Sequence, residues 1–194
     1  MKPTKEVMTP LSEDSAIALD AGDVVAITGY LFTARDTAHK RLVGLLRAGK
    51  DLPMDIRDQI IYYVGPAPAR PGYVCGPAGP TTSYRMDPYT PELLERGLRG
   101  MIGKGLRSDE VVASMKRNNA VYFAAVGGAA AVMAKSIKSS DVVAYEDLGP
   151  EAIRRLYVEA FPAIVVIDTR GRNLYESEPP KYATLVSGTG GDGA

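Results

Sequence analysis

Cysteine and histidine are nearly absent from this 194-residue sequence, which contains one of each. The single cysteine, Cys75, excludes an intrachain disulfide and any cysteine-based zinc or iron–sulfur site built from one copy of the chain. The single histidine, His39, excludes a self-contained histidine-rich metal site. The sequence therefore predicts no metal site of its own.

A surplus of one charge sign and long apolar runs are also missing. Lys plus Arg and Asp plus Glu number 23 each, so no net field attracts nucleic acid or an anionic membrane. No apolar run reaches the roughly 18 residues that suggest a membrane-spanning helix, and the N-terminus does not resemble a signal peptide. We therefore expect a cytoplasmic protein that binds neither nucleic acid nor membrane, and that recognises anions through a few placed cations.

The remaining composition is that of a globular protein. Apolar residues make up 45% and charged residues 24% of the chain, and its length is enough for one domain with a real core. We expect a single domain over residues 1–186, followed by a disordered glycine-rich tail at 187–194.

Strand and helix signals alternate after a weakly patterned stretch at 1–22. Apolar runs bounded by glycine predict strands, and apolar offsets of three and four predict helices. The predicted strands are 22–29 (with 30–33 as an extension or a bend), 60–64, 101–102, 120–126, 142–145 and 163–168. The predicted helices are 36–48 with Thr33 or Asp36 as N-cap, 90–99, 109–117 capped by Ser108, 129–137 after a turn at Gly127-Gly128, and 151–160. This alternation predicts an α/β fold with some parallel pairing.

Three cations occupy loops that leave predicted strands, where α/β folds usually place ligand groups. Arg35 opens a helix, Arg85 follows a stiff loop at 65–80 that holds five of the 14 prolines, and Lys104 stands between two glycines. Arginine offers a planar fork that matches a carboxylate, and lysine a compact charge. Together they would suit a small dicarboxylate. The alternative for each is a surface cation or a structural ion pair, which contributes only ~0–1 kcal/mol.

Hydroxyl groups and a histidine stand close to these cations in the sequence. Thr81, Thr82 and Ser83 lie just before Arg85, where one could bind a substrate oxygen or move a proton, or simply form a turn or cap. A threonine base would need strong stabilisation of its alkoxide. His39 is one turn after Arg35, so it could donate to a carboxylate and titrate near neutral pH, or only pack.

Three segments carry a resemblance to a known family. They are Thr33-Ala-Arg-Asp-Thr-Ala-His-Lys-Arg41, Gly76-Pro-Ala-Gly-Pro-Thr-Thr-Ser-Tyr-Arg-Met-Asp87 and Gly103-Lys-Gly105. Taken together, they resemble the signature segments of class I fumarase β subunits. The L-tartrate dehydratase β subunit and the C-terminal domain of the single-chain enzymes share these segments. The likeness runs over roughly residues 10–178, in order and with similar spacing.

The resemblance implies a fold, a partner and a cofactor. The fold is an α/β, three-layer swivelling β/β/α domain that pairs with a larger α subunit, with α2β2 as the family-based assembly. In the family, the α subunit holds a [4Fe–4S] cluster on three cysteines. The lone Cys75 agrees with a cluster held by the partner and not by this chain.

The resemblance also implies roles for individual residues. Arg35, Arg85 and Lys104 match residues that bind the carboxylates and hydroxyl of the substrate. Thr81 matches the threonine proposed as the base that removes a proton next to a carboxylate, while the acid would be an aspartate of the α subunit. Thr82 and His39 complete the predicted substrate-binding set.

The expected function is that of a hydro-lyase subunit, active only with its cluster-bearing partner. The leading prediction is reversible hydration of fumarate to (S)-malate. One alternative is an L-tartrate dehydratase β subunit, which uses the same machinery on a substrate with one more hydroxyl. Another is a non-catalytic anion-binding module of the same fold.

Overall fold

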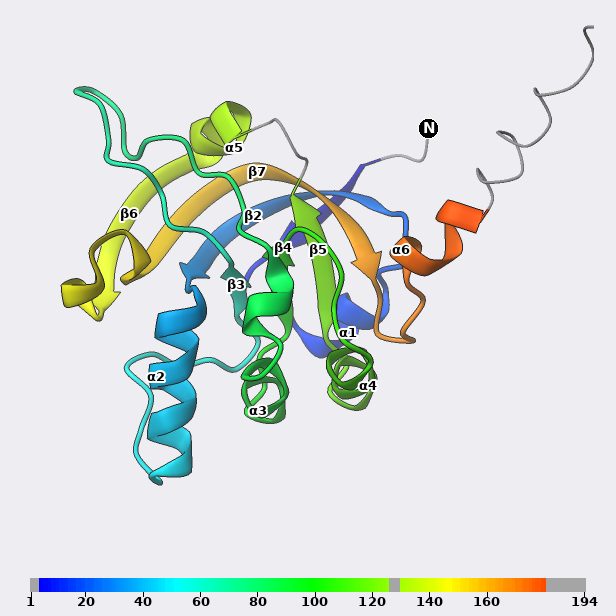
Figure 1. Cartoon of the computed structure of the whole chain (residues 1–194). Coiled ribbons are helices and arrows are strands. Elements are labelled where there is room, and N and C mark those ends of the chain that lie inside the picture. The colour runs from blue at the N-terminus through cyan, green and yellow to red at the C-terminus, as the bar shows by residue number, and fades with distance from the viewer. Residues whose placement is uncertain (1–3, 126–129, 181–194) are drawn as a thin grey trace, which may run out of the picture.

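A sheet of seven strands forms the centre of the computed structural model, which describes residues 4–125 and 130–180 (Figure 1). The strands are β1 (Lys5–Met8), β2 (Val24–Thr33), β3 (Ile60–Tyr62), β4 (Gly100–Gly103), β5 (Val121–Ala125), β6 (Ile137–Ala144) and β7 (Ile153–Ile167). The α-helices are α1 (Glu13–Ile17), α2 (Asp36–Arg47), α3 (Thr90–Glu95), α4 (Asp109–Arg117), α5 (Ala130–Ser136) and α6 (Leu174–Ser177). Two 3₁₀ helices cover Ser83–Met86 and Glu146–Glu151. The predicted turn at Gly127-Gly128 and the predicted tail at 187–194 lie outside the described residues.

Parallel and antiparallel pairings combine in this sheet. Strands β1 to β5 pair in parallel, in sequence order, whereas β7 runs antiparallel to β5, β2 and β6. Because β7 pairs with both β5 and β2, strands β2, β3, β4, β5 and β7 close into a ring. The predicted mixed α/β architecture with parallel strands is confirmed.

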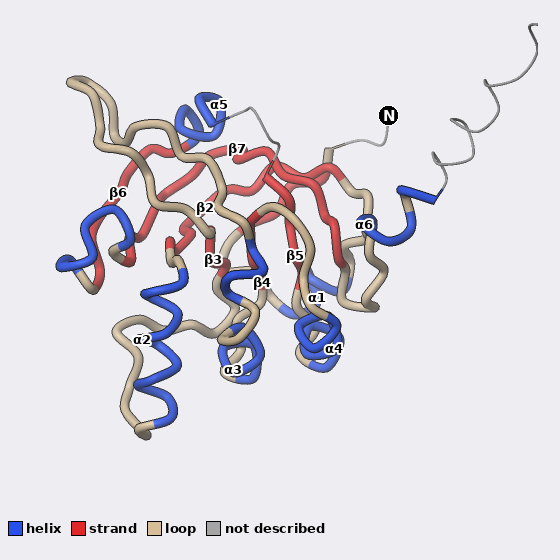
Figure 2. The backbone as a smooth tube through the Cα atoms, viewed as in Figure 1, coloured by secondary structure: helices blue, strands red, loops and turns tan. Residues whose placement is uncertain are grey.

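Strands β3 to β5 separate two hydrophobic cores. Along β3, Ile60 and Tyr62 face one core, and Ile61 and the following Tyr63 face the other, because successive strand residues point to opposite faces. Helices α2, α3 and α4 cover the second core on one side of the sheet (Figures 1 and 2). The long strands β2 and β7 and helix α1 enclose the first core.

The helix predicted at 151–160 is wrong, because residues 153–160 form the first half of β7 and Glu151 ends the second 3₁₀ helix. Ile153, Leu156 and Val158 are buried, and the offset of three between Ile153 and Leu156 mimics helical spacing. A strand forms here because β2 and β6 pair with it on either side and satisfy its backbone hydrogen-bonding groups. Ala160, with a φ of 48°, interrupts the regular strand beside the irregular pairing at Gly29.

The N-cap predicted for α2 is also wrong. The cap is Arg35, and its side chain makes no capping hydrogen bond. Thr33 is buried and binds across to β7 instead: its hydroxyl donates to the Ala152 carbonyl and accepts from the Arg154 amide. The cap predicted at Ser108 is confirmed, since its hydroxyl accepts from the Val111 amide.

The weakly patterned N-terminal stretch contains two elements that the sequence did not reveal. Strand β1 buries only Val7, which leaves almost no apolar pattern to detect. Helix α1 is five residues long and begins after Ser12, whose hydroxyl caps it. Within the described ranges, every helix is too short or too polar to cross a bilayer.

Candidate functional site

The carboxyl ends of β2, β3 and β4 bring the predicted site residues to one edge of the sheet. The register places Thr33 beside Tyr62, and Tyr62 beside Ile102, so these parallel strands end together. Arg35 follows β2, and Lys104 follows β4. Such an edge is where open α/β sheets bind ligands.

Arg35 is held at the start of α2 by contacts on two sides. Its Nη2 lies 3.3 Å from Oε1 of Glu151, and both side chains are about three-quarters buried, with 24% and 25% exposed. A Cβ at Gly65 would lie 3.0 Å from the Pro150 carbonyl oxygen and 3.1 Å from Arg35 Nη1, so a side chain there would press on the guanidinium. The buried Nε has no partner within the described residues, which leaves a donor for a ligand carboxylate.

Arg85 lies beside Arg35 although fifty residues separate them in sequence. Its Nη2 donates to Oδ2 of Asp36 at 2.7 Å, and Asp36 is the residue after Arg35. The Arg85 side chain is 39% exposed, so it can still meet a ligand from solvent. The structure therefore brings two of the three predicted cations to the N-terminus of α2.

The threonines and Lys104 meet at the neighbouring strand end. Thr81 donates its amide to the Tyr63 carbonyl at 2.7 Å, and Thr82 forms a parallel bridge with Lys104. Ser83 fastens this contact, since its amide donates to the Lys104 carbonyl at 2.9 Å and its hydroxyl accepts from the Lys104 amide at 3.1 Å. The Lys104 side chain is exposed, and both threonines are half-buried.

A buried ion pair beneath these residues was missed by the sequence reasoning. Arg107 donates through Nε to Asp87 at 2.7 Å, with the two side chains 0% and 11% exposed. The second Asp87 oxygen accepts from the Ser108 amide at 2.7 Å. Arg107 also donates to Thr90 and to Tyr63. The pair thereby joins the loop after Lys104 to the segment that carries Thr81 and Arg85.

Burial alone would lower the pKa of Arg107. The attraction of Tyr63 and Asp87 outweighs burial, and it raises the pKa above its ordinary value. The guanidinium therefore stays charged inside the protein. The signal available in the sequence was Asp87 at the end of the Thr-Thr-Ser-Tyr-Arg-Met-Asp run, but nothing in the sequence named its partner.

His39 lies in the core beneath Arg35. It is fully buried, its Nδ1 is 2.8 Å from the Arg35 carbonyl oxygen, and its ring packs edge-on against Tyr63. Because a carbonyl only accepts, Nδ1 carries the proton in this contact. Burial lowers the pKa of His39 to about 4, so the ring does not titrate near neutral pH as the sequence suggested. Its predicted contact with substrate stays a prediction.

Buried side-chain atoms that lack a partner gather at this same place. Within the described part of the chain they are Arg35 Nε, Asp36 Oδ1, His39 Nε2, Tyr145 OH and Glu151 Oε2. All belong to residues 35–39 or to residues 145–151, two segments that meet where Arg35 contacts Glu151 and Arg41 stacks over Tyr145. Buried polar groups are normally satisfied, so such a cluster is typical of a position that binds a ligand or water.

The arrangement can bind a small anion and can move a proton. Arg35, Arg85 and Lys104 place three cations along one edge, where Arg35 contacts Glu151 and Arg85 contacts Asp36. Thr81 lies in the loop segment that Thr82 joins to Lys104. Within the described residues, no group of three His, Cys, Asp or Glu side chains is placed to hold a metal ion. Burial also raises the pKa of the Cys75 thiol, which disfavours the thiolate that binds iron.

A pH effect on stability follows from His39. Its folded-state pKa of about 4 lies below the ordinary 6.5, so the native state binds fewer protons than the unfolded chain between these values. The stability that comes from the lowered pKa of His39 is fully present above pH 6.5 and is lost as the pH falls towards 4. We expect the free energy of unfolding to drop by about 2 kcal/mol between pH 7 and pH 5 from this group.

Urea unfolding measured across this range checks the expectation. His39 is the only histidine, so a His39→Asn variant should show a flatter dependence on pH even if it is less stable overall. An equal slope in both proteins would mean that another group causes the acid sensitivity.

Comparisons with known proteins identify the family of the chain. Residues 4–178 match the family model described as "Fumarase C-terminus". The chain is 40% identical over 178 residues to "Fumarate hydratase class I, anaerobic" from Escherichia coli strain K12, and 37% identical over 178 residues to "Fumarate hydratase 1, mitochondrial" from Leishmania major. These matches cover 90% of this chain but only 31% of each relative, so the chain spans about a third of their length.

A third relative has nearly the same extent as this chain. It is named "Putative L(+)-tartrate dehydratase subunit beta", from Methanocaldococcus jannaschii, and is 37% identical over 172 residues, 86% of this chain and 88% of that protein. With the family match over residues 4–178, this shows that the chain belongs to the fumarase C-terminal family, whose named members here are hydro-lyases.

Proposed function

We propose that this chain is the β subunit of a class I fumarate hydratase that interconverts fumarate and (S)-malate. The observation that carries the proposal is the convergence of Arg35, Arg85, Lys104 and Thr81 at the carboxyl edge of β2 to β4, in a chain similar to named fumarate hydratases. A dianionic substrate needs several cations when water is removed from it. This edge supplies three, of which Arg35 and Arg85 contact Glu151 and Asp36, and Lys104 has no carboxylate partner among the described residues.

The chain's own residues would bind the substrate and move one proton. In the proposed dehydration, Arg35 and Arg85 hold the carboxylates, and Thr81 takes the proton from the carbon next to one of them. Lys104, fixed beside Thr82, stabilises the charge on that carboxylate and on the threonine oxygen. The hydroxyl leaves with a second proton as water, and that proton comes from an acid outside this chain.

The partner we propose is a cluster-bearing α subunit, in a cytoplasmic α2β2 heteromer. Two observations support a site shared with a second subunit. A relative matched over 88% of its own length is named a subunit beta, and the lone cysteine of this chain cannot hold a [4Fe–4S] cluster. The exposed Tyr84 and Leu106 beside Arg85 and Lys104 offer apolar surface that a partner would cover.

We also propose that the chain has the three-layer swivelling β/β/α fold. Its support is the pair of hydrophobic cores on either side of β3 to β5, with α2, α3 and α4 against one of them. In this proposal the domain moves as a body against the α subunit and closes the site.

An L-tartrate dehydratase β subunit is the second candidate. The relative that this chain matches over most of both lengths carries that name. The same cations would bind tartrate, and its additional hydroxyl would need one more hydrogen-bonding group.

Co-expression tests the proposal directly. The chain is produced anaerobically with the cluster-bearing subunit encoded nearest to it, and dehydration of (S)-malate is measured beside that of L-tartrate. We expect malate activity only when both chains are present. Activity on L-tartrate alone would mean that tartrate is the substrate and that the same residues act on it. A formed complex with an intact cluster and no activity would favour an anion-binding module.

A further inference from the structure

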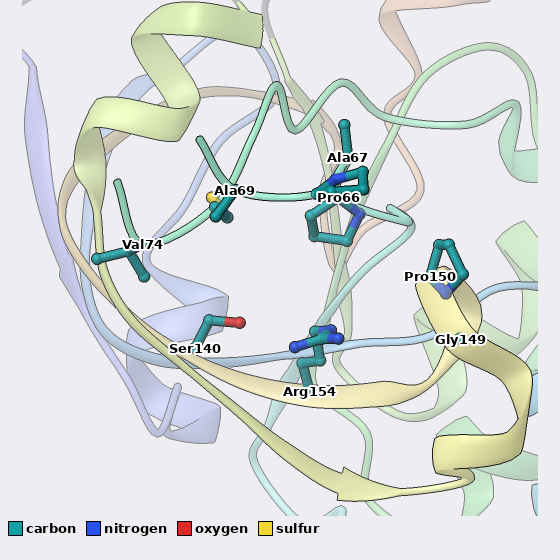
Figure 3. A pocket seen from close by; sticks show the side chains of 10 residues that line it. Pro66, Ala67, Ala69, Val74, Ser140, Gly149, Pro150 and Arg154 are labelled. Atoms are coloured by element: carbon teal, nitrogen blue, oxygen red, sulfur yellow. The ribbon is translucent and has the colours of Figure 1, made fainter. Parts of the chain in front are cut away.

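A cavity of about 320 Å³ lies between the proline-rich loop at 65–80 and strands β6 and β7 (Figure 3). Pro66, Pro68 and Val74 form an apolar wall on the loop side, and Ser140 and Arg154 lie on the strand side. Arg35, Arg85, Lys104 and Thr81 do not line it. The cavity is therefore distinct from the edge described above, although Gly149 and Pro150 of its lining adjoin Glu151, the partner of Arg35.

Arg154 has an uncompensated charge in this cavity. Within residues 4–125 and 130–180, its guanidinium has no hydrogen-bond acceptor and no carboxylate partner. The other arginines without a carboxylate partner there, Arg57, Arg70, Arg96 and Arg117, are all exposed. Arg154 alone among them is half-buried. A charge partly removed from water is costly without a counter-charge, so this position favours an anion.

Strand geometry directs Ser140 and Arg154 into the same space. Val142 of β6 pairs with Arg154 of β7, and Ser140 pairs with Leu156. Residues two apart on a strand share a face, so Ser140 and Arg154 are diagonal neighbours on one face. Figure 3 shows both side chains beneath the loop residues Pro66 and Ala69. A hydroxyl and a guanidinium thus face one ligand position.

We propose that this cavity binds a small monocarboxylate with a short apolar body. The Arg154 fork and the Ser140 hydroxyl donate to the carboxylate, and the apolar body packs against Pro66 and Val74. The cavity size is at the low end for small-molecule sites. One cation and apolar walls line this cavity, so it favours a ligand with one negative charge. The three cations at the carboxyl edge of the sheet are instead proposed to bind a dicarboxylate.

Isothermal titration of the full chain with butyrate tests the proposal. We expect saturable one-to-one binding, and no binding of butan-1-ol, which has the same body without the charge. Arg154→Gln should weaken butyrate binding by about tenfold or more, since it removes a charge-assisted hydrogen bond. Arg155→Gln is the matched control: Arg155 is the next residue, is exposed and pairs with Asp141 at 3.9 Å. It should bind as the unmodified chain does.

Three further measurements complete the test. Alkylation of Cys75, which also lines the cavity, should be slowed by butyrate in the unmodified chain and not in Arg154→Gln. Lys104→Ala should leave butyrate affinity unchanged, which separates this site from the proposed substrate site. Arg154→Gln should melt at or above the unmodified temperature, because it removes a half-buried charge that has no described partner. Absence of saturable binding, equal affinity in Arg154→Gln, or loss of affinity in Lys104→Ala would each overturn the proposal.

Discussion

Asp87→Asn is expected to lower the free energy of unfolding by about 3–5 kcal/mol, because it leaves a buried guanidinium without its counter-charge. The Arg107 side chain has no exposed surface, and Asp87 is its carboxylate partner in the described structure. Asparagine can keep one hydrogen bond, but it cannot offset the charge. The measurement is urea unfolding followed by circular dichroism, with the midpoint and slope compared between the two proteins.

Two companion variants make this result specific. Asp147→Asn removes a carboxylate of similar geometry, paired with Arg41 on the surface, and should leave the unfolding midpoint unchanged. The double variant Asp87→Asn with Arg107→Met has no buried charge, so it should recover part of the loss. An Asp87→Asn protein as stable as the unmodified chain would show that solvent reaches Arg107 and that the pair does not hold the loops together.

Lys104→Ala is expected to reduce turnover of the assembled enzyme by about 30-fold or more, the loss that follows from leaving a bound carboxylate unpaired. The exposed side chain makes no described contact that folding needs, so the melting temperature should change little. Its backbone bonds to Ser83 would persist, since they do not depend on the side chain. Steady-state kinetics with (S)-malate, on enzyme of equal cluster content, provides the measurement.

The matched control for this variant is Lys50→Ala. Lys50 is an exposed lysine beyond the end of α2, distant from the carboxyl edge of the sheet. It should turn over malate at the unmodified rate. Equal losses in the two variants would attribute the effect to general charge, and a fully active Lys104→Ala enzyme would remove Lys104 from the proposed mechanism.

Local sequence signals predicted the elements whose stabilising contacts lie nearby in the chain. Ser108 caps α4 through a residue three positions away, and the apolar stripe of α2 spans a single helix. Such contacts depend on neighbouring residues alone, so the pattern was sufficient. The family also followed from short segments, because the Gly-Pro-Thr-Thr-Ser-Tyr-Arg-Met-Asp run is specific.

Local sequence patterns gave wrong predictions where contacts with residues distant in the sequence decide the conformation. Residues 151–160 have spacing compatible with a helix, yet β2 and β6 pair with them and make them a strand. Thr33 was one of two residues predicted to cap α2. Its hydroxyl instead forms hydrogen bonds with Ala152 and Arg154, more than a hundred residues away. Local propensity is a weak preference, and a pairing partner on each edge outweighs it.

The sequence by itself determined the residue types of the candidate site, the lack of a cysteine set for a cluster, and the family. Only the tertiary structure decided that Arg85 meets Asp36 beside Arg35, that Asp87 faces Arg107, and that His39 is buried and neutral. The physical reason is that charge and chemistry belong to single residues. Distance, burial and the pKa values that follow from them depend on which segments fold against one another.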